Sequence, residues 1–344
     1  MSVSVQNRRI RLRSAVAAGL TALLLVPTIV LFIQVCESIA DERTSTSRER
    51  SAVQYLTGLD PLLTALVDAQ ATAVRQPPAG VPAAQPASTG PTALGAAVAG
   101  VADIDAAVGA DLGTTSRWAG LRSRIERLPT AASGNPAAAY QAYVEAGDLL
   151  LALYAAVADH SGLSRDPARD VAYLQRAAAV GLPETVLHAA RLADLSRLTA
   201  QPGADAKQLQ PQLPGLRLTV ETSLDELTGD LQAAGADTDS RTLSGGLLAT
   251  VDDMRRSIET LLRVSGKTDP DPVPQAAARG SAERARTELG DTVRTEIDGL
   301  LRSRLSALDN RAVRAQVTLG AAVLVALLAL LTILDGRGRP DAPR

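Results

Sequence analysis

The sequence is poor in the residues on which sheets, disulfides and metal sites depend. Aromatic residues make up only 2% of its 344 residues, and it contains one cysteine and two histidines. Strands are built largely from aromatic and β-branched residues, whereas the alanine, leucine and arginine that dominate here favour helices. One cysteine excludes a disulfide framework within the chain, and two histidines leave little for a Cys/His metal site. We therefore expect an all-α protein that holds no metal.

Two stretches of the sequence lack charged residues, namely residues 14–36 and residues 315–334. Roughly 20 apolar residues cross the hydrocarbon core of a bilayer as a helix, so we predict a transmembrane helix in each stretch. A cleaved signal peptide is the alternative for the first stretch, because basic residues precede it. Its apolar run is longer than the roughly 7–15 residues of a signal peptide, and no small-x-small cleavage site follows it closely, which favours the membrane anchor.

Arginine residues flank both apolar stretches. Four precede the first stretch, with no acidic residue among residues 1–35, and three follow the second. Positively charged flanks remain in the cytoplasm, so we place both termini inside the cell. The flanks carry +4 and +1 of the formal total of −2, which leaves −7 on the outer segment and disfavours a nucleic acid partner. The predicted organisation is a cytoplasmic N-terminus (1–13), a transmembrane helix (14–36), an extracytoplasmic domain (37–314), a second transmembrane helix (315–334) and a short cytoplasmic tail (335–344).

The extracytoplasmic domain reads as helices interrupted by proline and glycine. Residues 76–91 and 265–274 are rich in proline and are predicted to be linkers, and a break is expected near Gly113. Because each helix needs another to cover its apolar face, we expect a long helical bundle, for which two stacked four-helix bundles would accommodate the length. The first predicted helix ends at about residue 75, and the others cover residues 92–128, 137–163, 167–199, 216–234, 240–265 and 276–314.

The helix that follows the first apolar stretch is polar on a face that later becomes apolar. In steps of three or four residues, this face carries Arg43, Thr46 and Glu49 or Arg50 before it reaches Val53. Charges that face a bundle interior are costly unless they are paired or bind something. A planar guanidinium suits carboxylate, phosphate or nitrate, so this pattern predicts an anion site.

We expect the ligand-binding residues to be the arginines of this stretch and one tyrosine of a later helix: Arg43, Arg48, Arg50 and Tyr173. The alternative is a hydrated stretch next to the membrane, in which Glu42, Glu49 and the arginines pair on a solvated face. The sequence leaves both interpretations open.

A segment in the middle of the domain carries a recognisable pattern. Residues 157–192 read VADHSGLSRDPARDVAYLQRAAAVGLPETVLHAARL. This segment resembles the extracytoplasmic input regions of bacterial chemoreceptors, sensor histidine kinases and some cyclic-dinucleotide enzymes, in which D-x-S-x-L-x-x-D-P-x-x-D-x-Y-Y-L precedes L-P-E-L. Ala172 stands where the first of the paired tyrosines is usual. The matching positions are Asp159, Ser161, Leu163, Asp166, Pro167, Asp170, Tyr173, Leu174, Leu182, Pro183 and Glu184.

We assign a structural role to five of these positions, since an Asp-Pro pair starts a helix well: Asp166, Pro167, Asp170, Leu182 and Pro183. Residues 47–56, SRERSAVQYL, are similar to the start of nitrate/nitrite-type sensing domains in bacterial kinases. The resemblance implies a sensory helical bundle that is usually a homodimer. Those families continue past the second span into an output module. This sequence continues for ten residues past Leu334, so we expect no output module in it.

The sequence therefore predicts a membrane-anchored, sensor-like protein without catalytic activity. Its outer bundle would bind a small anionic ligand and pass a shift of the first helix against the last helix to a separate membrane or signalling partner. No nucleophile–base pair or cofactor loop stands out, so we expect neither an enzyme nor a cofactor. The alternative is a structural or accessory scaffold of the cell envelope, which would present an exposed apolar patch in place of a polar cavity.

Overall fold

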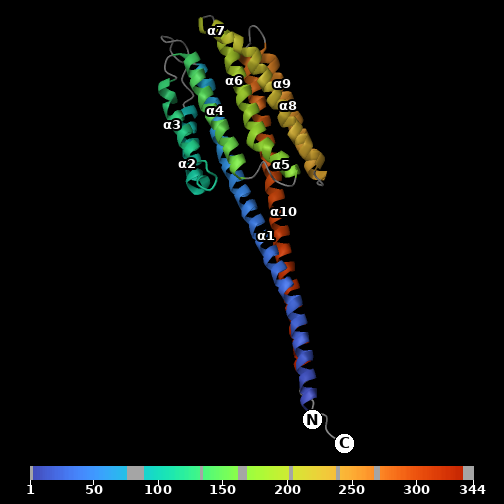
Figure 1. The fold of residues 1–344 in the computed structure, drawn as a ribbon. Coiled ribbons are helices and arrows are strands. Elements are labelled where there is room, and N and C mark those ends of the chain that lie inside the picture. Colours follow the sequence, from blue (N-terminus) through green and yellow to red (C-terminus); the bar gives the residue numbers. More distant parts are fainter. Residues whose placement is uncertain are drawn as a thin grey trace. The chain divides into compact units, whose positions relative to one another are not determined.

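The computed structural model describes residues 3–75, 89–131, 135–161, 169–200, 204–237, 241–266 and 272–335. Some side chains at helix ends, among them those of residues 3–27 and 329–335, lie outside the described set. Within these ranges every secondary-structure element is a helix and none is a strand (Figure 1), so the all-α prediction is confirmed.

The chain divides into two compact units. The smaller unit comprises Met1–Thr46 and Arg302–Arg344, and it contains the beginning of α1 (Val3–Val74) and the end of α10 (Pro272–Asp335). Within this unit the two helices contact each other through an ion pair between Arg43 on α1 and Asp309 on α10, at 2.5 Å. The larger unit, Ser47–Leu301, contains the remainder of both helices and all the helices between them.

The boundaries of the helices between α1 and α10 fall largely near the prolines and glycines at which the sequence predicts interruptions. Gly113 has a φ of 61°, a left-handed conformation that ends the helical path before α3. Asn135 starts α4, since its side-chain oxygen accepts a hydrogen bond from the backbone N–H of Ala137 at 2.8 Å. In chain order the elements are α2 (Thr89–Ile104), the π-helical turn η1 (Asp105–Gly109), α3 (Thr115–Ala131), α4 (Pro136–Ser161), α5 (Arg169–Arg176), the π-helical turn η3 (Ala177–Gly181), α6 (Leu182–Ala200), α7 (Ala204–Leu209), the 3-10 turn η4 (Gln210–Gln212), α8 (Leu213–Asp237) and α9 (Arg241–Ser265).

Two details differ from the helix pattern expected from the sequence. The helix predicted over residues 167–199 consists of α5 and α6 joined by the π-helical turn η3. Gly181 ends this turn against α8, where a Cβ would lie 3.1–3.3 Å from three atoms of Leu227, so a side chain here would require α8 to shift by a few tenths of an ångström. The short elements α7 and η4 were not predicted, because helices of three to six residues show too few turns for a periodic pattern.

The larger unit has a main apolar core to which all of its long helices contribute, and a second, smaller cluster formed by Val74, Tyr140, Leu195, Leu198 and Leu209. In Figure 1, α2, α3 and α4 lie on one side of α1, and α6, α8 and α9 lie beside α10. The two sets are joined, since α4 contacts α6 and the core continues from one set into the other. The structure thus places two four-helix sets beside each other on a shared core, whereas the sequence analysis predicts two stacked bundles. The largest fully buried side chains are Tyr55, Leu59, Leu62, Leu63, Leu66, Leu112, Leu121, Leu128, Leu150, Leu153 and Tyr154.

Two described helical stretches are long and apolar enough to cross a membrane: Thr92–Gly109 and a window within Val273–Leu328. The first stretch is partly buried, and its Leu94 and Val101 belong to the apolar core. Its surroundings are therefore those of a helix within the bundle. The second overlaps the predicted span 315–334, and its Val317, Val325 and Leu327 are exposed. The other predicted span, 14–36, falls largely on residues whose side chains are not described.

Leu149 and Leu150 are neighbours on α4 in opposite environments, since Leu150 is fully buried and Leu149 is 40% exposed. Replacing Leu150 by alanine leaves a cavity in the core, so we expect the free energy of unfolding to fall by about 2–5 kcal/mol. Leu149→Ala is the matched control and should lower it by about 0.5 kcal/mol. Urea unfolding followed by circular dichroism measures both, and equal losses would show that Leu150 does not belong to the core.

Candidate functional site

The arginines predicted to bind a ligand lie on the exposed side of α1. Arg43 is paired with Asp309 in the smaller unit, and Arg48 and Arg50 are exposed at the start of the larger unit. The buried side of the same stretch carries Thr46 and Glu49, which are 0% and 2% exposed. The buried residues of the polar stripe are therefore a threonine and a glutamate. The ligand-binding role of the three arginines stays a prediction.

The other predicted positions lie around the α5–α6 region. Tyr173 is half-buried on α5, and the guanidinium carbon of Arg176 lies 6.0 Å from the centre of its ring. Arg176 in turn donates from Nε to Asp230 on α8 at 2.6 Å. The remaining predicted positions divide into two groups. Leu182 and Pro183 are buried at the start of α6, whereas Asp166, Pro167 and the side chain of Asp170 lie outside the described residues.

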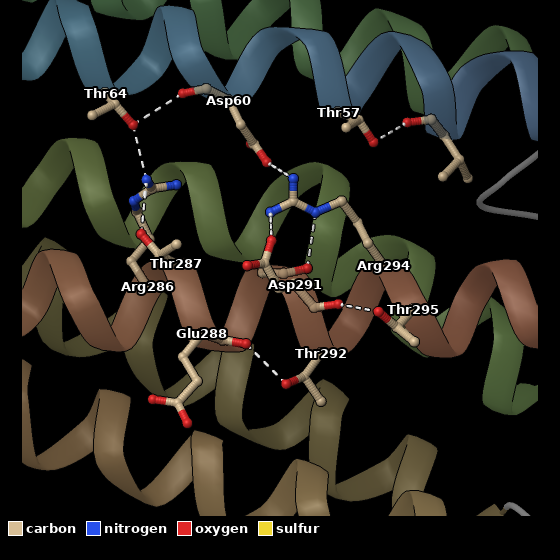
Figure 2. Close-up of polar contacts among 12 residues, drawn as sticks. Thr57, Asp60, Thr64, Arg286, Thr287, Glu288, Asp291, Thr292, Arg294 and Thr295 are labelled. Carbon is tan, nitrogen blue, oxygen red and sulfur yellow. Dashed lines mark hydrogen bonds and ion pairs between the residues drawn. The ribbon is translucent and has the colours of Figure 1, made fainter.

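Inside the larger unit, three arginines of α10 face α1 at regular intervals. We call Arg279, Arg286 and Arg294 the arginine ladder. Figure 2 shows two of its contacts. Arg294 forms an ion pair with Asp60, whose carboxylate also accepts a hydrogen bond from the Tyr154 hydroxyl at 3.0 Å. Arg286 donates to the hydroxyl oxygen of Thr64 at 2.8 Å. Since residue numbers rise along α1 as they fall along α10, the two helices run antiparallel here.

The third arginine of the ladder joins α1, α6 and α10. Arg279 donates to the backbone carbonyl of Val67 at 2.9 Å and to Asp194 Oδ1 on α6 at 2.8 Å. Gln70 on α1 donates to the second oxygen of the same carboxylate at 2.9 Å. Asp194 is only 3% exposed, and each of its oxygens has a donor, so this buried charge is compensated within the protein.

A pocket of about 240 Å³ opens beside the ladder, between α1, α6, α9 and α10. This volume is below the roughly 300–1,000 Å³ typical of drug-sized ligands, so the pocket suits a small molecule. Most of its wall is apolar, with Val67, Val186, Met254, Ile258 and Leu261 among the lining residues. Its charged lining residues are Asp68, Arg75, Arg279, Glu283 and Arg286.

Charges at the edge of this pocket are only partly compensated. Burial lowers the pKa of the Arg75 guanidinium, and the neighbouring Arg279 and Arg197 lower it further. The Nε–H of Arg75 is donated to the backbone carbonyl of Ala71, at 2.8 Å, and not to a carboxylate. Burial raises the pKa of the Asp68 carboxyl, and although Arg279 opposes this effect, Glu283 adds to it. A ligand that supplies opposite charges would therefore be stabilised here.

Neither the ladder nor the pocket is among the sites that the sequence pattern predicts. A signal was present, because the three arginines recur at intervals of seven and eight residues and so share one face of the last helix. Their partners could not be found in this way. Thr64, for example, is 222 residues from Arg286, and periodicity does not indicate which helix a face contacts.

Comparison with protein-family models, with curated proteins and with solved structures finds no match for this chain. In the part of the chain that the structure describes, no group of three or more His, Cys, Asp or Glu side chains is arranged to hold a metal ion. What the described site offers chemically is a small apolar pocket edged by guanidinium and carboxylate groups, which is an arrangement for binding.

Asp60 makes the stability of the bundle depend on pH. Burial raises the pKa of its carboxyl above 3.8, although Arg294 and Arg286 oppose this. A raised pKa means that the stabilising contribution of Asp60 is complete below pH 3.8 and is lost as the pH rises through the value in the folded protein. We expect the free energy of unfolding of the wild type, relative to Asp60→Asn, to fall as the pH rises from about 4 to 7.

Urea unfolding at a series of pH values measures this difference. Asp291→Asn is the control for loss of a charge, because it removes an exposed carboxylate that also pairs with Arg294. A difference between wild type and Asp60→Asn that grows with pH over this range would contradict the prediction.

Proposed function

We propose that the chain is a two-pass membrane protein of the sensor type, with both termini in the cytoplasm and its helical bundle outside. The bundle binds a small ligand with an anionic group in the pocket between α1, α6, α9 and α10. Binding shifts α1 against α10, and this shift is passed to a separate membrane or signalling partner.

The observation that carries the proposal is the position of the pocket between the two longest helices. Arg75 directly follows the last residue of α1, and Arg279 and Arg286 belong to α10. These two helices comprise 72 and 64 residues and lead toward the two apolar stretches of the sequence. A ligand held by both helices can favour one register of α1 against α10, provided that it binds that register more tightly.

The membrane part of the proposal is supported by composition. The helix α10 contains an exposed apolar window of membrane-spanning length. The stretch 14–36 has no charged residue, and four arginines precede it. Arginines on the outer flank of each stretch favour cytoplasmic termini.

The ligand-binding part can be tested by titrating the 344-residue protein, purified in detergent, with nitrate, acetate, phosphate and amino acids. We expect heat of binding and a raised melting temperature for at least one compound that carries an anionic group. Arg75→Gln should weaken binding by about tenfold or more, because a charge-assisted hydrogen bond is lost. Arg50→Gln is the matched variant for the predicted arginines of α1, since its side chain is exposed and distant in sequence from the pocket.

Each outcome of this titration decides between interpretations. Weaker binding in Arg75→Gln with unchanged binding in Arg50→Gln supports the pocket, and the reverse result moves the site to the predicted arginines. No heat and no melting shift across the whole panel would overturn the sensor proposal and favour the scaffold alternative.

The topology can be tested by cysteine labelling, because Cys36 is the one cysteine of the chain. In a Cys36→Ser background, Leu218→Cys places a thiol at a position on α8 that is 64% exposed. We expect a membrane-impermeant maleimide added to intact cells to label Leu218→Cys but not Asn7→Cys, which lies before the first apolar stretch. Labelling of Asn7→Cys alone would reverse the orientation, and recovery of the protein in the soluble fraction would remove the membrane anchor.

A further inference from the structure

The edge of the pocket carries both signs of charge near the end of α1. Asp68 lies on α1 and Arg75 directly follows its last residue, Val74, so the two are seven residues and about 10 Å apart along the direction of the helix. On α10, Glu283 adds to the negative charge around Asp68, whereas Arg279 acts on both Asp68 and Arg75 and forms an ion pair with Asp194. The pocket thus has an acidic side and a basic side.

The surface between the two sides is apolar. Val67 on α1, Val186 on α6, and Met254 and Ile258 on α9 line the pocket together with Ala282 on α10. A molecule that reaches from the acidic side to the basic side must lie along these side chains, so its middle part should be apolar. Charged groups are favourable only at its ends.

A simple anion meets only part of this arrangement. An anion at Arg75 would leave Asp68 and Glu283 facing the same small pocket, and these carboxylates repel negative charge. Two carboxylates and three guanidiniums line the pocket, but Glu283 pairs with Arg286 and Arg279 pairs with Asp194, so Asp68 and Arg75 are the acid and the base that remain among the described lining residues. Positive and negative charge at the pocket are therefore close to balance, whereas a site for a simple anion would carry an excess of positive charge.

We propose that the pocket takes a small zwitterion whose ammonium and carboxylate groups lie at opposite ends of a short apolar body. The ammonium group lies at Asp68, and the carboxylate lies at Arg75. This inference rests on the proposed function, because it names the class of ligand for the same pocket.

The test compares 6-aminohexanoate with hexanoate and hexylamine, which each lack one of its charges, by calorimetry on the detergent-purified 344-residue protein. We expect 6-aminohexanoate to bind at least about tenfold more tightly than either compound. L-leucine, whose two charges are adjacent, should also bind more weakly. If hexanoate, nitrate or leucine binds as tightly as 6-aminohexanoate, the inference is overturned while the proposed function stands. If none of these organic compounds binds while nitrate, acetate or phosphate does, the inference alone is overturned; if no compound of either panel binds, the proposed function is overturned with it.

Two variants separate the two sides of the pocket. Asp68→Asn should remove the preference for 6-aminohexanoate over hexanoate, and Arg75→Gln should remove its preference over hexylamine. Both side chains are partly covered by the pocket but remain accessible to solvent, so the fold should tolerate the changes. Asp252→Asn is the matched control, since Asp252 is exposed on α9 and does not line the pocket. An equal loss of preference in Asp252→Asn would overturn the assignment of the two sides.

The location can be tested without changing any charge. Gly280 lines the pocket, and a Cβ at this position would meet no atom within 4 Å. Gly280→Ala should therefore fold and bind as the wild type does, while Gly280→Leu should fill the pocket and weaken binding of 6-aminohexanoate by at least about tenfold. Circular dichroism verifies the fold of both variants. Unchanged binding in a folded Gly280→Leu protein would place the ligand elsewhere and overturn the inference.

Discussion

The antiparallel contact between α1 and α10 is the constraint on which the larger unit depends. The three arginines of the ladder use three kinds of acceptor on α1, namely the Asp60 carboxylate, the Thr64 hydroxyl and the Val67 carbonyl. A shift of one helix by a full turn would separate these pairs together. Because buried guanidiniums without partners are costly, the ladder defines one register for the two longest helices of the chain.

The neighbouring helices are attached to this contact by polar groups as well as by the apolar core. Tyr154 binds α4 to the Asp60 carboxylate, and Asp194 binds α6 to both Arg279 and Gln70. The pocket lies beside these groups, so a ligand in it would contact residues whose partners belong to the register contact itself. This arrangement gives a small molecule a physical means of acting on two helices that are far apart in sequence.

The sequence predicts the helices better than it predicts their contacts. The break at Gly113 follows from residue type, because proline, glycine and their neighbours act locally. The apolar stripe that includes Leu59 and Leu63 also follows from periodicity. The site could not be predicted in the same way. Helical periodicity does not decide between neighbouring residues, so it does not distinguish Glu49, which is buried, from Arg50, which is exposed. The residues of α1 that accept hydrogen bonds from the ladder also lie far from it in the sequence.

The ladder is not uniform along its length, and this has a consequence for its response to salt. The side chains of Asp60 and Arg294 are both about one-fifth exposed, whereas in the second ion pair the side chain of Arg279 is equally exposed and only that of Asp194, at 5%, is buried. Dissolved ions screen exposed ion pairs more than buried ones. The hydrogen bond from Arg286 to Thr64 is less sensitive to salt, because the hydroxyl that accepts it on α1 is neutral. Rising ionic strength should therefore weaken the Asp60–Arg294 ion pair more than the Asp194–Arg279 ion pair. The contact between α1 and α10 would then be lost first at Asp60 and last near Asp194.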